Sequence, residues 1–212
     1  MNKFLKRKIE LFRKLADGIS LKVDVIKLHD PILKKLMSIK SYKDRMEFLK
    51  DSFELLGEGS SRAVYALSET LIIKLATNIK GLAQNLEESR ICAQRNCTAK
   101  VILADHEGKW NINNRIEKID KVDFEKLTGI DFDDFTSSIY YQLNAEGDYK
   151  KPNRYNEVSM NPFFKDVVGL ILDANLQIGD LRKLSSWGEL NGKAVLSDFG
   201  LSRDVWSSLY EN

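Results

Sequence analysis

A strand–loop–strand–turn–strand pattern over residues 53–76 constrains the fold of this chain more than any other feature. Gly57 and Gly59 separate the first two apolar runs, and a polar turn at 68–70 separates the second from the third. Short apolar runs bounded by turn residues predict strands that pair with their neighbours. The segment 82–94 then predicts a helix. A small antiparallel sheet with one helix is therefore expected in this part of the chain.

Helical patterns fill the first fifty residues. Apolar residues recur at helical spacing over 3–16. Asp30 followed by Pro31 is typical of a helix N-terminus, so a helix is predicted over 30–39. A third helix is expected over 42–51. Together these segments predict a helical N-terminal extension.

The second half of the chain is expected to be mostly helical. The acidic segment 121–148 carries apolar residues at helical spacing, and 163–176 is the most apolar helix that the sequence predicts. The polar stretch 149–158 contains a proline and predicts a loop. Hairpins are predicted over 100–113 and around Asn191-Gly192, a dipeptide typical of two-residue hairpin turns.

Composition excludes several classes of protein. The hydrophobic fraction is 43% and the charged fraction is 30%, as in ordinary globular proteins. No apolar run approaches the roughly 18 residues that a membrane span needs. The N-terminus becomes charged again within a few residues, which excludes a secretory signal with an apolar middle. We therefore expect a cytoplasmic protein that makes no use of a membrane.

Cysteine and histidine are sparse. Cys92 and Cys97 lie close together, but a cytosolic setting favours free thiols over a disulfide. His29 and His106 complete the inventory and show no spacing typical of a zinc site.

Charge is unevenly distributed along the chain. The formal net charge is +2, yet residues 1–50 contain 14 Lys and Arg against 6 Asp and Glu, which gives +8 and leaves −6 for the remainder. A basic surface of this kind could contact nucleic acid or an acidic protein. A solvated helical face explains the same charges, and we favour it because no aromatic stacking pattern accompanies them.

The glycine loop and the strand that follows it carry the first candidate site residues. Gly57 and Gly59 lack side chains that would keep a backbone away from nucleotide phosphates, although a flexible turn uses the same residues. Lys74 lies in a strand of Leu, Ile and Ala, so it is either an exposed lysine or a cation held against phosphates. Such a cation needs an acidic partner. We prefer Glu88, 14 residues after Lys74, and expect Glu87 to face solvent.

Two aspartates form a second group of candidates. Asp198 begins the tripeptide Asp198-Phe199-Gly200, which directly follows an apolar strand. A carboxylate at a strand end next to a flexible glycine suits Mg²⁺ on a nucleotide. Asp180 lies 18 residues earlier, after the apolar helix, where it could accept the proton of a substrate hydroxyl.

The order of these features resembles that of the protein-kinase-like superfamily over residues 53–203. The runs 57–65, 73–75 and 196–200 carry the resemblance. It implies an α+β, two-lobed fold with a small antiparallel sheet plus helix and a reduced helical C-lobe. The implied parts are a helical N-terminal extension, an N-lobe and a C-lobe: 1–51, 52–118 and 119–212.

The resemblance also implies roles for the candidate residues. ATP would be held by four of them: Gly57, Gly59, Lys74 and Glu88. Magnesium would be bound by Asp198. Lys74 and Asp180 would be the catalytic pair.

The chain departs from the family pattern at several positions. Arg62 stands where the third glycine is expected, and Ile178-Gly179 replaces the His-Arg that precedes the catalytic Asp. The Asn that holds the second metal would fall at Ser185, and a hydroxyl is a poorer metal ligand than an amide oxygen. Only 12 residues follow Gly200, which leaves little for a peptide-binding platform.

Three functions remain open from the sequence. The first is a pseudokinase or binding module, with weak or no phosphotransfer and a protein partner. The second is an active Mg-ATP-dependent phosphotransferase with a minimal C-lobe. The third is nucleic-acid binding through residues 1–50. The short, Lys- and Asn-rich chain is typical of a phage-encoded variant, which would place it in a host cytoplasm or a virion.

Overall fold

The computed structural model describes residues 30–91, 96–144 and 150–211. The chain divides after Ser41 into two units, Met1–Ser41 and Tyr42–Asn212. In the first unit, α3 (Asp30–Ser38) confirms the helix predicted over 30–39. The helix predicted over 3–16 lies outside the described residues.

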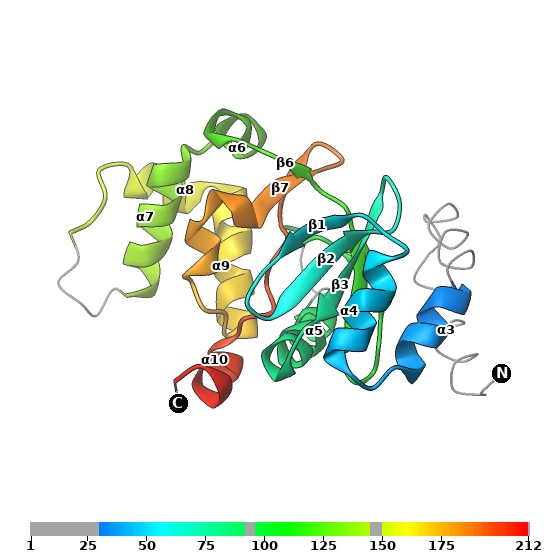
Figure 1. The fold of residues 1–212 in the computed structure, drawn as a ribbon. Helices are drawn as coiled ribbons and strands as arrows, with labels where there is room; N and C mark the ends of the chain where they lie inside the picture. The colour runs from blue at the N-terminus through cyan, green and yellow to red at the C-terminus, as the bar shows by residue number, and fades with distance from the viewer. Residues whose placement is uncertain (1–29, 92–95, 145–149, 212) are drawn as a thin grey trace. The chain divides into compact units, whose positions relative to one another are not determined.

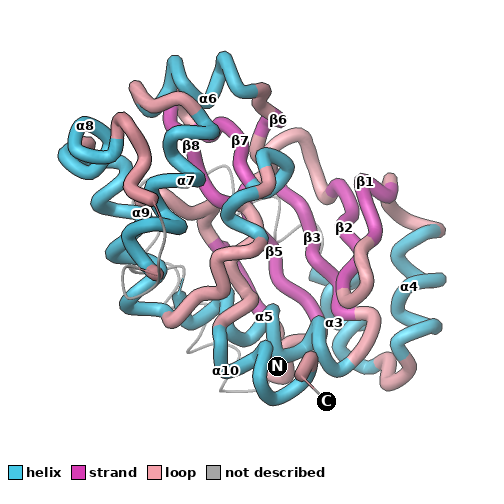
Figure 2. The backbone as a smooth tube through the Cα atoms, turned by 90° about the vertical axis from the view of Figure 1, so that its left-hand side faces the viewer, coloured by secondary structure: helices cyan, strands magenta, loops and turns pink. Residues whose placement is uncertain are grey.

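The second unit begins with α4 (Tyr42–Lys50) and continues into a five-stranded antiparallel sheet of order β1-β2-β3-β5-β4. Figure 2 shows four of these strands side by side, β5, β3, β2 and β1. The five strands are Leu55–Glu58, Arg62–Ala66, Leu71–Ala76, Val101–Ala104 and Trp110–Asn114. Every residue of β3, the central strand, is buried, including Lys74, the one charged residue in its otherwise apolar sequence.

One helix, α5 (Ile79–Ile91), connects β3 to β4 and packs against the sheet. The predicted α+β architecture, a small antiparallel sheet with one helix, is therefore confirmed. The sequence placed this helix at 82–94, three residues late at its start. Asn78 explains the earlier start, because its side chain accepts hydrogen bonds from the backbone amides of Lys80 and Gly81.

Helices and a three-stranded sheet make up the rest of the second unit (Figure 1). The small sheet has the order β6-β7-β8, with strands Glu117–Lys118, Trp187–Leu190 and Lys193–Leu196. The helices are α6 (Lys121–Thr128), α7 (Phe132–Leu143), α8 (Tyr155–Met160), α9 (Pro162–Ala174) and α10 (Arg203–Leu209).

Two predictions for this half need correction. The described part of the predicted 121–148 helix forms two helices, because Gly129 adopts the left-handed conformation (φ 74°) that ends α6, and the Asp131 side chain caps α7. The polar stretch 149–158 was predicted as a loop, but it becomes helical from Tyr155. The hairpin at Asn191-Gly192 is confirmed, with φ of 54° and 75° at its two turn residues.

The helical half is built around an aromatic core. Its rings lie close together, with Phe124 and Phe132 5.0 Å apart and Phe135 and Trp187 5.4 Å apart between centroids. Phe199 belongs to the same buried core and is only 1% exposed. Because burying a phenylalanine stabilises a protein by about 1.5–3 kcal/mol, this ring fixes the position of the chain next to it, including Asp198.

Within the described part of the chain, no helix is both long and apolar enough to cross a membrane.

Candidate functional site

Two cationic side chains, Lys74 and Arg62, lie on the same face of the five-stranded sheet. In the β2–β3 pairing, Lys74 is opposite Val64 and Arg62 is opposite Ala76. Residues two apart along a strand share a face, so the diagonal pair Arg62 and Lys74 projects to one side. That side is closed, since Arg62 is 7% exposed and Lys74 is 5% exposed.

Helix α5 covers this face with a stripe of small and polar residues. The stripe follows helical spacing and consists of Gly81, Gln84, Asn85, Glu88 and Ile91. A carboxylate and an amide are buried here because two cations lie opposite them, and buried polar groups need partners. Only Glu88 of this stripe was singled out from the sequence. Gly81, Gln84 and Asn85 precede Glu88 at the helical spacing i, i+3, i+4, i+7, and this spacing could have identified the whole buried face.

Glu88 is the acidic partner of Lys74. The Lys74 ammonium donates to both Glu88 carboxylate oxygens at 2.9 Å and to the backbone carbonyl oxygen of Ser197. All three of its protons therefore have acceptors within the protein. Glu87 pairs instead with Arg90 on the same helix.

Arg62 joins this pair to the second group of candidates. Its Nη1 donates to Glu88 Oε1 at 2.8 Å and to Asn85 Oδ1 at 3.4 Å, and its Nη2 donates to Asp198 Oδ1. One guanidinium thus connects the sheet, α5 and the segment that follows β8. The sequence identified Arg62 only as a departure from the glycine pattern. Its role here was missed because an arginine at a strand start gives no sequence signal of burial.

Charge compensation holds the cluster of Arg62, Lys74, Glu88 and Asp198 together. Burial alone would lower the pKa of Arg62, but the charges of Asp198 and Glu88 outweigh burial and raise this pKa. Burial lowers the pKa of Lys74, with the charge of Glu88 opposing this and that of Arg62 adding to it. Burial would raise the pKa of Asp198, but Arg62 and Lys74 together lower it. The carboxylate form of Asp198 is therefore favoured.

Asp180 lies beside the cluster and belongs to a pair of its own. It begins a 3₁₀ turn (Asp180–Arg182), and its carboxylate accepts a hydrogen bond from Lys183 Nζ at 2.7 Å. That bond raises the pKa of Lys183, and the charge of Asp198 contributes to the same shift. Lys183 therefore bonds Asp180 and also feels the charge of Asp198. Ser185, at the position expected for a second metal ligand, is exposed.

The glycine loop is tied down at its tip but open along β1. Ser60 and Ser61 accept hydrogen bonds through their carbonyl oxygens from the Asn78 side chain and the Thr77 amide. A Cβ atom at Gly57 would have no described atom within 4 Å. Neither packing nor the sign of φ therefore requires glycine at this position.

A hydrogen-bonded chain connects the loop to the C-terminal helix. The Ser61 hydroxyl donates to Gln84 Oε1 at 2.9 Å, and Gln84 Nε2 donates to the Tyr210 hydroxyl at 2.9 Å. Tyr210 also stacks on Trp206, with centroids 5.1 Å apart, and Lys80 lies 4.0 Å from its ring centroid. The loop, α5 and the end of α10 are therefore positioned by one another.

The residues present do not fit a magnesium ion in this arrangement. The described residues contain no group of three His, Cys, Asp or Glu side chains that could hold a metal. Asp198 is bonded to Arg62, and Asp180 is bonded to Lys183. Mg²⁺ on a nucleotide is normally held by one or two carboxylates, and here both candidates carry a protein cation.

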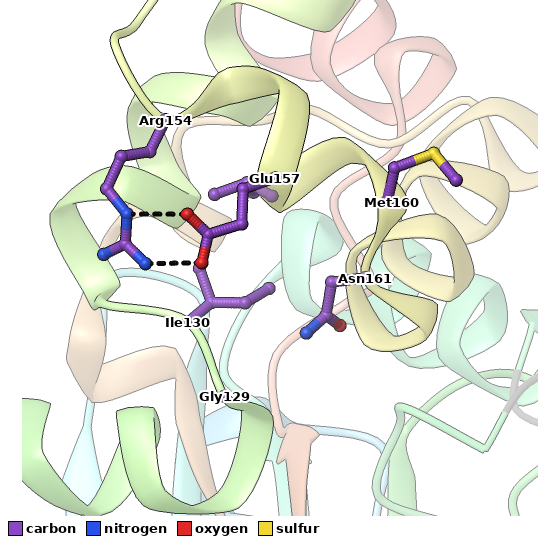
Figure 3. Close-up of a pocket in the computed structure, with 7 residues that line it drawn as sticks. Gly129, Ile130, Arg154, Glu157, Met160 and Asn161 are labelled. Carbon is purple, nitrogen blue, oxygen red and sulfur yellow. Dashed lines mark hydrogen bonds and ion pairs between the residues drawn. The ribbon is translucent and has the colours of Figure 1, made fainter.

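A shallow hollow of about 260 Å³ lies elsewhere, where α8 meets the end of α6 (Figure 3). Seven residues line it: Gly129, Ile130, Arg154, Glu157, Val158, Met160 and Asn161. None of the predicted site residues is among them. Arg154 bonds Glu157 at 2.7 Å and Asp134 at 3.0 Å, so the charges at its rim already have partners.

Cys97 is buried, whereas Cys92 lies outside the described residues.

Comparison with known proteins shows distant structural similarity and no sequence relative. No protein family model matches the chain, and no curated protein matches its sequence. Among solved structures, the chain is similar to an aminoglycoside phosphotransferase in the ternary complex of streptomycin, ATP and APH(2")-IIa. The identity is 11% over 76% of this chain and 71% of that chain, with a TM-score of 0.35.

Proposed function

We propose that residues 53–203 form a protein-kinase-like nucleotide-binding module with weak or no phosphotransfer. The observation that carries this proposal is the cluster that joins Lys74 and Glu88 to Asp198. Three residues from separate parts of the chain, each chosen for a role toward a nucleotide, contact one another directly or through Arg62.

The strand order supports the same proposal. A β1-β2-β3 meander with a glycine loop is followed by α5 and by two strands that complete the sheet beside β3. This is the small sheet plus helix expected of a kinase-like N-lobe. The β7–β8 hairpin and Asp198 follow in the expected order.

The incomplete metal site argues for a binding module rather than an efficient kinase. Phosphoryl transfer depends almost entirely on positioning and on neutralising charge, to which the metal ions contribute strongly. Asp198 is bonded to Arg62, and Ser185 stands in place of the second metal ligand. The contributions of the metal ions to positioning and to charge neutralisation are therefore reduced. A module of this kind would act on a protein partner, as the sequence led us to expect.

An active Mg-ATP-dependent phosphotransferase is the second candidate. Two observations favour it: the Lys74–Glu88 ion pair is formed, and Asp180 is connected to Asp198 through the charge of Lys183. A catalytic base next to a nucleotide carboxylate is what such an enzyme needs.

Calorimetric titration with ATP in the presence of Mg²⁺ tests the proposal. We expect binding by the wild type that is lost in Lys74→Met and retained in Asp198→Ala, with no ADP formed over hours. Lys165→Met, at an exposed position of α9, is the matched control and should bind like the wild type.

Two outcomes would contradict it. Absence of binding by the wild type at millimolar ATP, roughly −4 kcal/mol of binding free energy, would exclude a nucleotide module. Binding that requires both Mg²⁺ and Asp198, accompanied by ATP turnover, would favour the phosphotransferase.

A further inference from the structure

Arg62 bonds the carboxylate that a nucleotide-bound cation would need. Its guanidinium lies between the Lys74–Glu88 pair, which is expected to meet phosphates, and Asp198, which is expected to meet the metal. An arginine fork bonds carboxylates on both sides with directional hydrogen bonds. A cation held by the protein therefore replaces one that would arrive with the ligand.

The charges of the cluster are already balanced. Arg62 and Lys74 contribute two positive charges, and Glu88 and Asp198 contribute two negative charges. Without Arg62 the same cluster would carry one net negative charge, on Asp198. A site of that composition attracts a divalent cation, whereas the balanced site does not.

The outer surface of the cluster also opposes a nucleotide. The side chain of Asp198 is 45% exposed, whereas that of Arg62 is 7% exposed and that of Lys74 is 6% exposed. A phosphate that approaches meets the carboxylate first, while the cations lie behind it with their protons engaged. Like charges at such short range disfavour binding.

We infer that Arg62 is an inhibitory cation built into the fold, which weakens the binding of a magnesium nucleotide for as long as it bonds Asp198. This inference rests on the proposed function and names its regulation. Magnesium nucleotide and Arg62 compete for the same carboxylate, so affinity is set by how readily the guanidinium gives way.

Titration of Mg²⁺-ATP into wild type, Arg62→Gln and Arg62→Lys tests this inference. Arg62→Gln removes the charge and the guanidinium fork but keeps a polar side chain. We expect it to bind Mg²⁺-ATP about 10- to 100-fold more tightly than the wild type, the equivalent of one charge-assisted hydrogen bond. Arg62→Lys keeps the charge but not the guanidinium fork, so its affinity for Mg²⁺-ATP should lie between those of the wild type and Arg62→Gln. Arg90→Gln removes an exposed arginine of α5 that pairs only with Glu87 among the ion pairs described, and should bind like the wild type.

The outcomes separate the inference from the proposed function. If Arg62→Gln binds Mg²⁺-ATP no more tightly than a wild type that does bind it, the inference is wrong and the nucleotide module stands. If no variant binds, both are wrong. Should Arg62→Gln lose its cooperative thermal transition, Arg62→Lys decides, because equal or weaker binding than the wild type would overturn the inference.

Discussion

Glu88 is the residue on which the buried charges depend. It is fully buried and bonds both cations, Lys74 at 2.9 Å and Arg62 at 2.8 Å. Each cation has a further acceptor, Ser197 for one and Asp198 for the other. Glu88 has no comparable substitute, since the two cations need a carboxylate between them.

Removal of Glu88 should therefore destabilise the fold more than removal of Lys74. Glu88→Gln leaves two buried cations facing each other and should cost about 3–5 kcal/mol of unfolding free energy. Lys74→Met leaves Glu88 bonded to Arg62 and should cost about 1–2 kcal/mol, within the ordinary range for single substitutions. Urea unfolding of the two variants and the wild type measures both. A larger loss for Lys74→Met would show that Glu88 is not the centre of the cluster.

The sequence revealed one half of this cluster and hid the other. Lys74 stood out as a lone charge in an apolar strand, and Asp198 stood out beside Phe199 and Gly200 after another. Arg62 looked like a tolerable substitution, because the sequence does not show that β2 and β3 pair with Arg62 and Lys74 on one face. Strand register is a tertiary property, and no local pattern encodes it.

At the scale of elements, α5 is the part most tightly fitted to its surroundings. Gly81 brings it so close to the glycine loop that a Cβ atom would lie 2.1 Å from the Ser61 carbonyl oxygen. Near the middle of α5, a Cβ atom added to Gly200 would lie 2.4 Å from the Gln84 carbonyl oxygen. Each of these contacts is between two backbone segments, so neither side can move aside as a flexible side chain would.

Gly81→Ala and Gly57→Ala should differ in how much they change stability. Alanine normally stabilises a helix interior by about 1 kcal/mol relative to glycine. At Gly81 we expect a net loss of about 1–3 kcal/mol instead, because the helix must shift away from the loop. Gly57→Ala has open space and should change stability by less than about 0.5 kcal/mol. Thermal or urea unfolding compares them, and a stabilised Gly81→Ala would mean that α5 does not lie against the loop.

Element boundaries were predictable where a local signal exists. The 30–39 and 163–176 helices and the Asn191-Gly192 hairpin follow from caps, periodicity and turn chemistry. The break at Gly129 was missed because apolar periodicity continues across it. Helix α8 was missed because six residues are too few to show a period.

At the scale of the whole second unit, the sheet and the helical half are connected through the segments that flank the site. Residues 97–99 pair with Leu196, through hydrogen bonds of 2.8 and 2.9 Å. Leu176 pairs with Ser202 just after Gly200. Asp198 therefore lies in a segment that is fixed at Leu196 and at Ser202, and Arg62 of the sheet bonds its side chain. The kinase-like order of motifs in the sequence is consistent with this convergence, which only the folded chain makes visible.

Amide NMR of the ¹⁵N-labelled chain, titrated with Mg²⁺-ATP, tests most directly whether this convergence is a nucleotide site. The account predicts saturable shifts at Gly57, Gly59, Lys74 and the amides around Asp198, larger at equal ligand in Arg62→Gln than in the wild type. Shifts confined to the hollow beside Arg154, or no shifts in either protein at millimolar ATP, would contradict it.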